Sequence, residues 1–348
     1  MATEARAITL YRDNKVLMIT TAIILALVTL TLCAAVAARL IVLPLVSGTH
    51  VPEDDASCHG LQLALESHVR AIASKPHNLQ VPADLEAAAR YIETELASYG
   101  LKTEPQIFDV GGHPVRNIEV VIEPENPAPG IATLVIGAHY DSAEGTPGAN
   151  DNGTGVAALL EIARTFAQTP PVCSRRLRIV FFVNEELPYG KTGDMGALRH
   201  AERLKTSGEN VVGMIALETL GYFSNEPGSQ RLPFPFNMIY PKTGHFLAFV
   251  GLPGSGRFLR QTVAAFRAVS IFPSAGTVVP GFVEGADLSD HWAYHHVGFS
   301  ALMATDTAPY RNPFYHQSYD TPDTVNYGAL AHITRGLEAT VRKLVAMA

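Results

Sequence analysis

The chain has 348 residues, with 26 Lys and Arg against 33 Asp and Glu, and its net charge is −7. The first 50 residues carry four basic and two acidic side chains, a net +2, which leaves −9 on residues 51–348. An acidic body without a basic stripe argues against a nucleic acid as partner. With 47% hydrophobic residues and three cysteines, the chain is neither a disordered protein nor a disulfide-rich scaffold.

A run of 23 uncharged, mostly apolar residues lies between Lys15 and Arg39. Because a helix needs about 20 such residues to cross a bilayer, residues 16–38 are predicted as a single transmembrane anchor. Basic residues before the run favour a cytoplasmic N-terminus at 1–15 and a periplasmic or extracellular body. A cleaved signal peptide is the alternative, although its apolar core usually has only about 7–15 residues. We therefore expect a single-pass protein whose partner is the lipid bilayer.

Residues 39–57 contain Pro44, Gly48 and Pro52 and are predicted as a stalk, so the folded domain is expected at 58–348. Apolar runs typical of buried strands alternate there with helical patterns. The strands are expected at 132–138, 177–183, 211–217 and 300–304, and the helices at 61–74, 83–99, 155–168, 258–269 and 327–346. This alternation predicts one α/β domain with a central mixed, mostly parallel sheet flanked by helices.

Two further features of the body have alternative interpretations. Residues 224–257 are rich in Gly, Pro and aromatic side chains and are predicted as an inserted loop that either walls a pocket or packs on the core. Cys58 and Cys173 are the only cysteines beyond the anchor. In an oxidising compartment they can form a disulfide; otherwise they pack as small hydrophobic side chains.

Five groups of metal-capable residues lie at or just past predicted strands, where ligands bind in open α/β sheets. Each group alone has an ordinary explanation, such as a hydrogen-bonded histidine at His139, a helix cap at Asp151 or a solvated loop at Glu185. Asp141 is placed to accept the second ring N–H of His139, and Asp320 to cap or orient a neighbouring segment. Together the groups supply two histidines and three carboxylates as ligands with one spare glutamate, which matches a two-zinc hydrolase. These residues are His139, Asp151, Glu185, Glu186, Glu218 and His316.

The order of these groups resembles peptidase family M28, and most closely its bacterial membrane-anchored or secreted aminopeptidases. The motifs are HYD at 139–141, GANDNGTG at 148–155, NEE at 184–186, Glu218 after a strand, and YH with a later DT at 315–321. The resemblance runs from about residue 71 to the C-terminus. It implies a zinc-exopeptidase-like fold, two Zn²⁺ per chain, and peptide substrates with a free N-terminus.

The resemblance also implies roles for individual residues. One zinc is expected on His139 and Glu218 and the other on Glu186 and His316, with Asp151 and a water or hydroxide bridging them. Glu185 is expected as the general base, and Tyr315 as a group that polarises the scissile carbonyl. Asp290 and His291 match a segment near the substrate pocket, with a purely structural pair as the alternative. A cis peptide bond is expected between Asp151 and Asn152.

Two departures from the family pattern are visible: Glu218 stands where many members have Asp, and LPYGKTGDMG at 187–196 differs from the commoner sequence after the glutamate pair. The second departure affects the pocket wall. Three alternatives to an aminopeptidase stay open: a glutaminyl cyclase-like enzyme with one zinc, a carboxypeptidase or other amidohydrolase, and a non-enzymatic ectodomain. The last is disfavoured because every expected ligand is present. The sequence does not indicate an oligomeric state.

Overall fold

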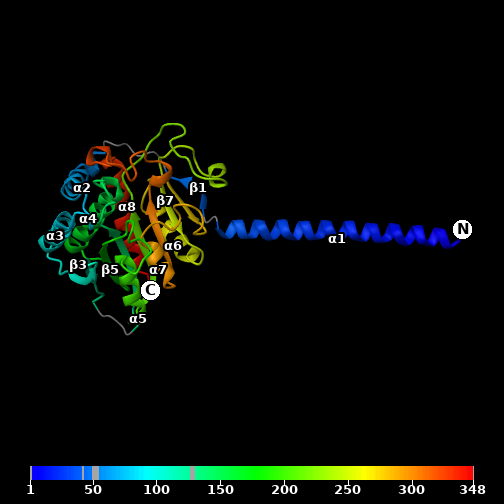
Figure 1. The fold of residues 1–348 in the computed structure, drawn as a ribbon, viewed down its shortest axis with the longest axis horizontal. Helices are drawn as coiled ribbons and strands as arrows, with labels where there is room; N and C mark the ends of the chain where they lie inside the picture. Colours follow the sequence, from blue (N-terminus) through cyan, green and yellow to red (C-terminus); the bar gives the residue numbers. More distant parts are fainter. Residues whose placement is uncertain (1, 41–42, 49–54, 126–129, 348) are drawn as a thin grey trace.

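The N-terminal helix stands apart from the rest of the molecule. The structure is a computed structural model that describes residues 2–40, 43–48, 55–125 and 130–347. Helix α1 (Ala2–Leu40) projects away from a body that contains all the other elements (Figure 1). Its window Asn14–Cys33 has a mean hydropathy of 2.6 and is not covered by the body. Within the described ranges it is the one helix long and apolar enough to cross a membrane.

The body is built on one mixed sheet with the strand order β1-β8-β7-β9-β6-β4-β5-β3-β2. The described strands are β1 (Leu43–Ser47), β2 (Glu104–Val110), β3 (His113–Ile122), β4 (Ala132–His139), β5 (Arg176–Phe182), β6 (Asn210–Glu218), β7 (Leu247–Gly251), β8 (Ser274–Val278) and β9 (Ala301–Thr305). The central strands β9, β6, β4 and β5 run parallel to one another, as do β7 and β8. The remaining neighbours pair antiparallel. The predicted α/β class is confirmed, and the parallel part is concentrated at the centre of the sheet.

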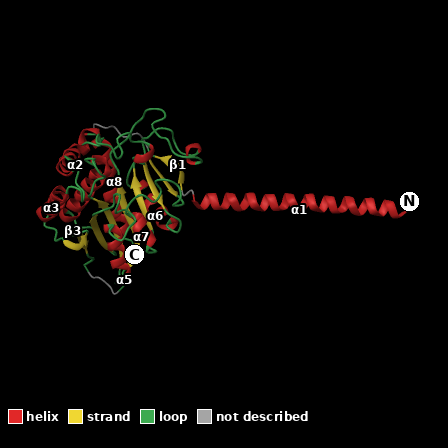
Figure 2. Ribbon diagram, in the orientation of Figure 1, coloured by secondary structure: helices red, strands yellow, loops and turns green. Residues whose placement is uncertain are grey.

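Helices cover both faces of the sheet (Figure 2). One face carries α2 (His59–Ile72), α3 (Pro82–Ser98), α4 (Thr154–Gln168), α6 (Gly256–Arg267) and α8 (Tyr327–Val345), and the other carries α5 (Gly196–Thr206) and α7 (His291–His296). Alternate side chains of β4 enter two separate cores: Leu134 and Ile136 lie in one, and Val135 lies in the other. A strand buried on both faces needs apolar residues at every position, which explains the continuous apolar run of β4.

Two segments differ from their predicted form. The predicted stalk contains β1, which pairs antiparallel with β8, with Leu43 opposite Gly276 and Ser47 opposite Ser274. The predicted insertion at 224–257 contains β7, a strand between β8 and β9, so its irregular part ends at Phe246. β7 has only five residues, and an apolar run that short between glycines and prolines cannot be assigned from its pattern alone.

Candidate metal centre

The central parallel strands bring the expected ligands to one edge of the sheet. His139 is the last residue of β4, Glu218 is the last residue of β6, and Glu186 follows β5. Asp151 lies in the turn Ala149–Gly153 before α4, and His316 lies in the loop between β9 and α8. Because the carboxyl ends of parallel strands share one edge, side chains far apart in the sequence converge there.

These five side chains form two groups that share Asp151. His139, Asp151 and Glu218 make one group, and Asp151, Glu186 and His316 make the other; within each group the ligand atoms lie within 4.8 Å of one another. His139 Nε2 lies 3.3 Å from Asp151 Oδ1 and 3.4 Å from Glu218 Oε2. His316 Nε2 lies 3.0 Å from Asp151 Oδ2 and 3.2 Å from Glu186 Oε1. The two oxygens of Asp151 therefore face two different histidines.

Asp320 fixes the backbone that carries Asp151. Its Oδ1 accepts the N–H of Asn150 at 2.9 Å, and its Oδ2 accepts the N–H of Asp151 at 3.1 Å. Asn152 ties the same turn to the end of β6, because its Nδ2 donates to the carbonyl of Leu217 at 2.8 Å. The Asp151–Asn152 peptide bond is cis, as the resemblance implied. Asp320 thus orients the turn before α4, in line with its expected supporting role.

Asp141 contacts the site through both its backbone carbonyl and its carboxylate. His139 Nδ1 lies 3.0 Å from the backbone oxygen of Asp141 and 3.6 Å from its carboxylate, so the carbonyl is the nearer partner. The carboxylate instead accepts the backbone N–H groups of Glu185 and Glu186, each at 3.1 Å. A single buried carboxylate therefore fixes the two adjacent glutamates after β5. The sequence could not show this, because it does not reveal which atoms of Asp141 face which neighbour.

The spare glutamate and the tyrosine border the two groups without belonging to them. Glu185 Oε2 lies 3.9 Å from His139 Nε2, and its side chain is 14% exposed. Tyr315 stacks on His316 with ring centroids 4.0 Å apart. Both residues line a cavity that also borders Asp151, Glu218 and His316. They are therefore accessible to a molecule that lies against the metal-capable side chains.

The electrostatics of the site are strongly unfavourable for its carboxylates. Burial raises the pKa of Glu185 well above its usual value, and the charges of Glu186 and Glu218 raise it further. Burial also raises the pKa of Glu218 to about 7. Burial alone would lower the pKa of His316, but the adjacent carboxylates of Asp151 and Glu186 raise it to about 11. So many buried acids require positive charge nearby, which protons or metal cations can supply.

Ser289 is a site residue that sequence reasoning missed. Its hydroxyl donates to Glu218 Oε2 at 2.8 Å. The next two residues, Asp290 and His291, match a family segment near the substrate pocket, with a structural pair as the alternative. Both are fully buried, and neither borders the cavity at the metal-capable groups. His291 Nε2 bonds to the carbonyl of Ala286 at 2.9 Å, so the structural alternative describes it better.

A second, almost entirely apolar cavity opens beside the site. Glu218 and Tyr315 line both this cavity and the one at the metal-capable groups. Its walls come from the loop before β7, with Leu232, Phe236 and Tyr240, and from the strands β7, β8 and β9. The cavity has a volume of about 90 Å³. It gives the site room for an apolar side chain next to the reacting groups.

Comparison with known proteins places this geometry in a family. A sequence profile described as peptidase family M28 matches residues 117–341. The chain belongs to peptidase family M28. Membership of this peptidase family makes it a peptide hydrolase, and a relative from Pyrenophora teres, 34% identical over 131 residues, is named a probable zinc metalloprotease.

The M28 chain has relatives of several kinds. It is 36% identical over 290 residues to the uncharacterised protein YfbL of Escherichia coli, which covers 80% of this chain and 87% of that protein. It is 31% identical over 214 residues to LpqL, a probable lipoprotein aminopeptidase of Mycobacterium tuberculosis, covering 57% of this chain but only 39% of that protein. Among solved structures, LapB of Legionella pneumophila aligns with a TM-score of 0.64 at 21% identity, covering 87% of this chain and 80% of LapB. A glutaminyl cyclase of Porphyromonas gingivalis aligns with a TM-score of 0.60 at 18% identity, covering 82% and 98%. At these identities the structural matches show the fold alone.

The donor set of this M28 chain fits zinc. His139 Nε2, Asp151 Oδ1 and Glu186 Oε1 are buried and lack a hydrogen bond of good geometry among the described residues. Imidazole nitrogens and carboxylate oxygens are ordinary zinc ligands, with bonds of about 2.0–2.2 Å. Buried polar atoms that point toward one another without a protein partner are expected where a cation binds.

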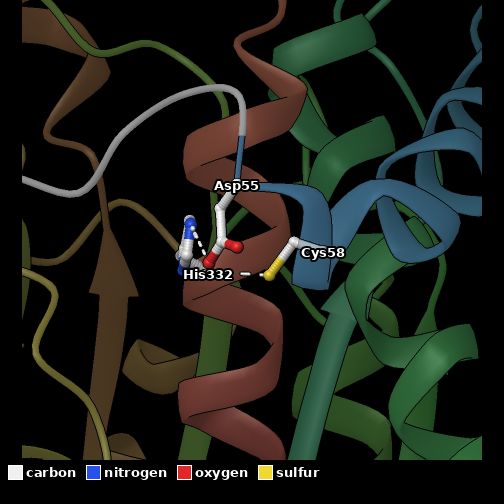
Figure 3. A group of neighbouring side chains, drawn as sticks. All are labelled: Asp55, Cys58 and His332. Carbon is white, nitrogen blue, oxygen red and sulfur yellow. Dashed lines mark hydrogen bonds and ion pairs between the residues drawn. The ribbon is translucent and has the colours of Figure 1, made fainter.

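A third metal-capable group lies elsewhere and has a different character. Figure 3 shows Asp55, Cys58 and His332 pointing toward one another, with His332 on α8. Arg335 already supplies a cation there: its Nη2 lies 3.2 Å from His332 Nδ1 and 3.8 Å from Asp55 Oδ2. We therefore interpret this group as an ion-pair network that ties the start of the body to α8.

This group also explains why Cys58 and Cys173 do not form the disulfide considered above. Both are free thiols, and Cys58 Sγ lies 3.9 Å from His332 Nδ1. Cys173 precedes Ser174, whose N–H donates to the carbonyl of Val345 at the end of α8. At a rise of about 1.5 Å per residue, Val345 lies roughly 20 Å along the helix from His332. The two cysteines therefore lie near opposite ends of α8.

Proposed function

We propose that the protein is a metallo-aminopeptidase that holds two Zn²⁺ ions and removes the first residue of peptides. The observation that carries this proposal is the pair of ligand groups that share Asp151. In this assignment His139 and Glu218 hold one zinc, Glu186 and His316 hold the other, and Asp151 contacts both. Bound zinc would act as a Lewis acid and lower the pKa of a water molecule toward 7.

Glu185 is the residue that we assign to proton transfer. Its carboxylate lies beside the ligand groups but is not a member of either. Its raised pKa suits a group that accepts a proton during attack on the carbonyl and returns it to the leaving amine. Asp141 holds the backbone of Glu185 and so sets the position of the carboxylate. We assign Tyr315, which lines the same cavity, to donate its hydroxyl to the developing oxyanion.

The two cavities support an exopeptidase with an apolar first subsite. The acidic side chains would bind the free α-amine of the substrate, which restricts cleavage to the N-terminal residue. The apolar cavity behind Glu218 and Tyr315 would hold the first side chain, so Leu, Met and Phe are expected to be preferred over Asp and Lys. An acidic or ammonium side chain there would lose its hydration without a partner.

The test is a panel of aminoacyl-coumarins with free and acetylated amines, run with and without a chelator. Free Leu and Phe substrates should be cleaved, acetylation should remove most of the cleavage, and chelation should abolish it until zinc is returned. Elemental analysis should find close to two zinc ions per chain. Equal cleavage of acetylated and free substrates would refute the aminopeptidase assignment and favour an endopeptidase or amidohydrolase.

The glutaminyl cyclase-like alternative rests on the structural match to the Porphyromonas gingivalis cyclase. It predicts ring closure of an N-terminal glutamine with release of ammonia, one zinc, and no peptide cleavage. We favour hydrolysis because both histidines and three carboxylates form two groups around Asp151.

We also propose that α1 anchors the enzyme in a membrane. Its apolar window is exposed along its whole length in the described structure, and a lipid bilayer would cover it. Arg6, Arg12 and Lys15 favour a cytoplasmic N-terminus, and in this proposal the catalytic body faces the periplasm or the exterior. Protease added to intact spheroplasts should digest the body; protection until lysis would reverse this topology.

A further inference from the structure

The loop between β6 and β7 has an outer side that the catalytic proposal does not use. Three large apolar side chains at its tip are exposed: Phe234 at 78%, Met238 at 76% and Ile239 at 37%. Its inner side, with Leu232 and Phe236, walls the apolar cavity. Apolar side chains clustered on an exposed loop tip indicate a surface that contacts another apolar phase.

The two ends of this loop lie next to each other and carry positive charge. The N–H of Gln230 donates to the carbonyl of Lys242 at 3.1 Å, which brings the two ends of the loop together. Arg231 and Lys242, both exposed, stand at these ends. No Asp or Glu occurs from Gln230 to His245, although the body as a whole is acidic. The apolar tip of the loop suits the acyl region of a bilayer, and the positively charged ends of the loop suit anionic headgroups.

The loop lies beside the edge of the sheet that is formed by β1, the first strand after α1. The Tyr240 hydroxyl lies 3.5 Å from the carbonyl of Gly276 in β8, and Gly276 is opposite Leu43 at the start of β1. A shallow cavity lined by Gly48, Pro241 and Pro273 shows that the loop also adjoins the end of β1. In Figure 1 this loop lies beside β1, on the side from which α1 extends.

The short connection to α1 keeps this edge close to the lipid. Arg39 is the first charged residue after the apolar run, and charged residues at that place lie at headgroup level. Only three residues lie between Arg39 and Leu43, so the four steps from one to the other reach at most about 14 Å when fully extended. The edge at β1 and the neighbouring loop therefore cannot lie far from the membrane surface in which α1 is anchored.

We propose that the tip of this loop, with Phe234, Met238 and Ile239, inserts into the surface of the bilayer that holds α1. Arg231 and Lys242 then contact the headgroups, preferably anionic ones. This contact is separate from catalysis, because Phe234 and Met238 border neither cavity at the site. It places one wall of the substrate cavity at the membrane surface.

The experiment uses the full chain in lipid nanodiscs and a tryptophan placed at the loop tip. The chain has one tryptophan, Trp292, whose signal is measured in the unsubstituted protein and subtracted. Phe234→Trp reports on the loop. Ile107→Trp is the matched control, because Ile107 is 67% exposed on β2, at the opposite edge of the sheet.

Nanodiscs with brominated acyl chains should quench most of the fluorescence added by F234W and leave that of I107W unchanged, since interfacial side chains lie about 5–10 Å into the headgroup and acyl boundary. In discs with anionic lipid, adding Arg231→Glu and Lys242→Glu should reverse much of the quenching. Equal signals from F234W and I107W would overturn the proposal, as would failure of the chain to enter the discs. A blue shift of F234W without bromine quenching would also overturn it, because the tip would then be covered by protein, either its own or a second copy.

Discussion

Replacing Glu185 with Gln separates proton transfer from metal binding. Gln has nearly the same shape, and the backbone N–H at this position still donates to Asp141 Oδ1. Gln cannot accept a proton near neutral pH. Because general acid–base groups contribute about 10²–10⁴-fold to the rate, kcat should fall by that factor, which corresponds to about 2.7–5.5 kcal/mol of barrier. KM should change little, since Glu185 is assigned no part in binding the substrate side chain.

The metal content and stability of E185Q provide the controls on that result. Glu185 belongs to neither ligand group, so E185Q should keep both zinc ions. Its stability should not fall, because burial and the neighbouring acids already disfavour the charged form of this side chain. Glu186→Gln is the matched variant: Glu186 Oε1 lies 3.2 Å from His316 Nε2, so this change should weaken one zinc site directly.

The assay combines single-substrate kinetics with elemental analysis of the same samples. Loss of zinc from E185Q but not from E186Q would show that the roles of the two glutamates are reversed. Unchanged turnover in both variants would refute the catalytic interpretation of residues 184–186.

Three further predictions concern pH, the support of Asp151 and the sheet edge. Glu218, with a pKa of about 7, must lose its proton to bind zinc, and so must His316, with a pKa of about 11. Zinc affinity, measured by competition with a chelating dye, should therefore fall as the pH is lowered from 8 to 6. The loss should be about tenfold per pH unit from His316 and about tenfold over the whole interval from Glu218, whose pKa lies inside it. A flat profile would contradict these protonation states. Asp320→Asn sets an amide N–H₂ against a backbone N–H and should reduce the free energy of unfolding by about 1–3 kcal/mol in urea titrations. The control variant Asp323→Asn, at an exposed position, should change the free energy of unfolding by less than about 0.5 kcal/mol. Equal effects of the two substitutions would show that the hydrogen bonds to Asn150 and Asp151 do not matter. Removing residues 1–40 should leave a soluble body, whereas removing 1–50 also deletes β1, exposes the edge of β8 and should increase self-association in light scattering; identical behaviour would mean that β1 does not protect that edge.

The sequence predicted best those parts of the fold that are buried on both faces. The runs that became β4, β5 and β6 are apolar apart from single interruptions such as Thr133 and Arg178, and α4 and α8 have clear helical periodicity. The strands near the edges were missed for a physical reason. β8, with the sequence SAGTV, contains small and polar residues whose burial depends on α6, and β1 pairs only because the tertiary fold brings it to β8. Local patterns do not contain such long-range contacts.

In the candidate site, too, some residues could be predicted from the sequence and others could not. Strand ends followed by His or Glu are visible in the sequence, so His139, Glu186 and Glu218 could be singled out before their positions were known. Ser289 carries no such signal, because nothing in LSDHW shows that its hydroxyl rather than Asp290 faces Glu218. The partners of Asp141 depend on atomic orientation, which no spacing rule specifies. Supporting contacts are therefore the part of a site that sequence reasoning predicts least well.

The pairing of β1 with β8 has a consequence for where the enzyme can work. A body joined to its anchor by a long flexible tether would sweep a large volume above the membrane. Here only residues 41 and 42 separate α1 from a strand that is hydrogen-bonded into the sheet. With α1 in a bilayer as proposed, so short a connection would keep the body within a short distance of the lipid surface. Its substrates would then be the chain ends that enter a thin layer next to the lipid, and encounter rates would depend on the area of membrane rather than on the volume of the compartment.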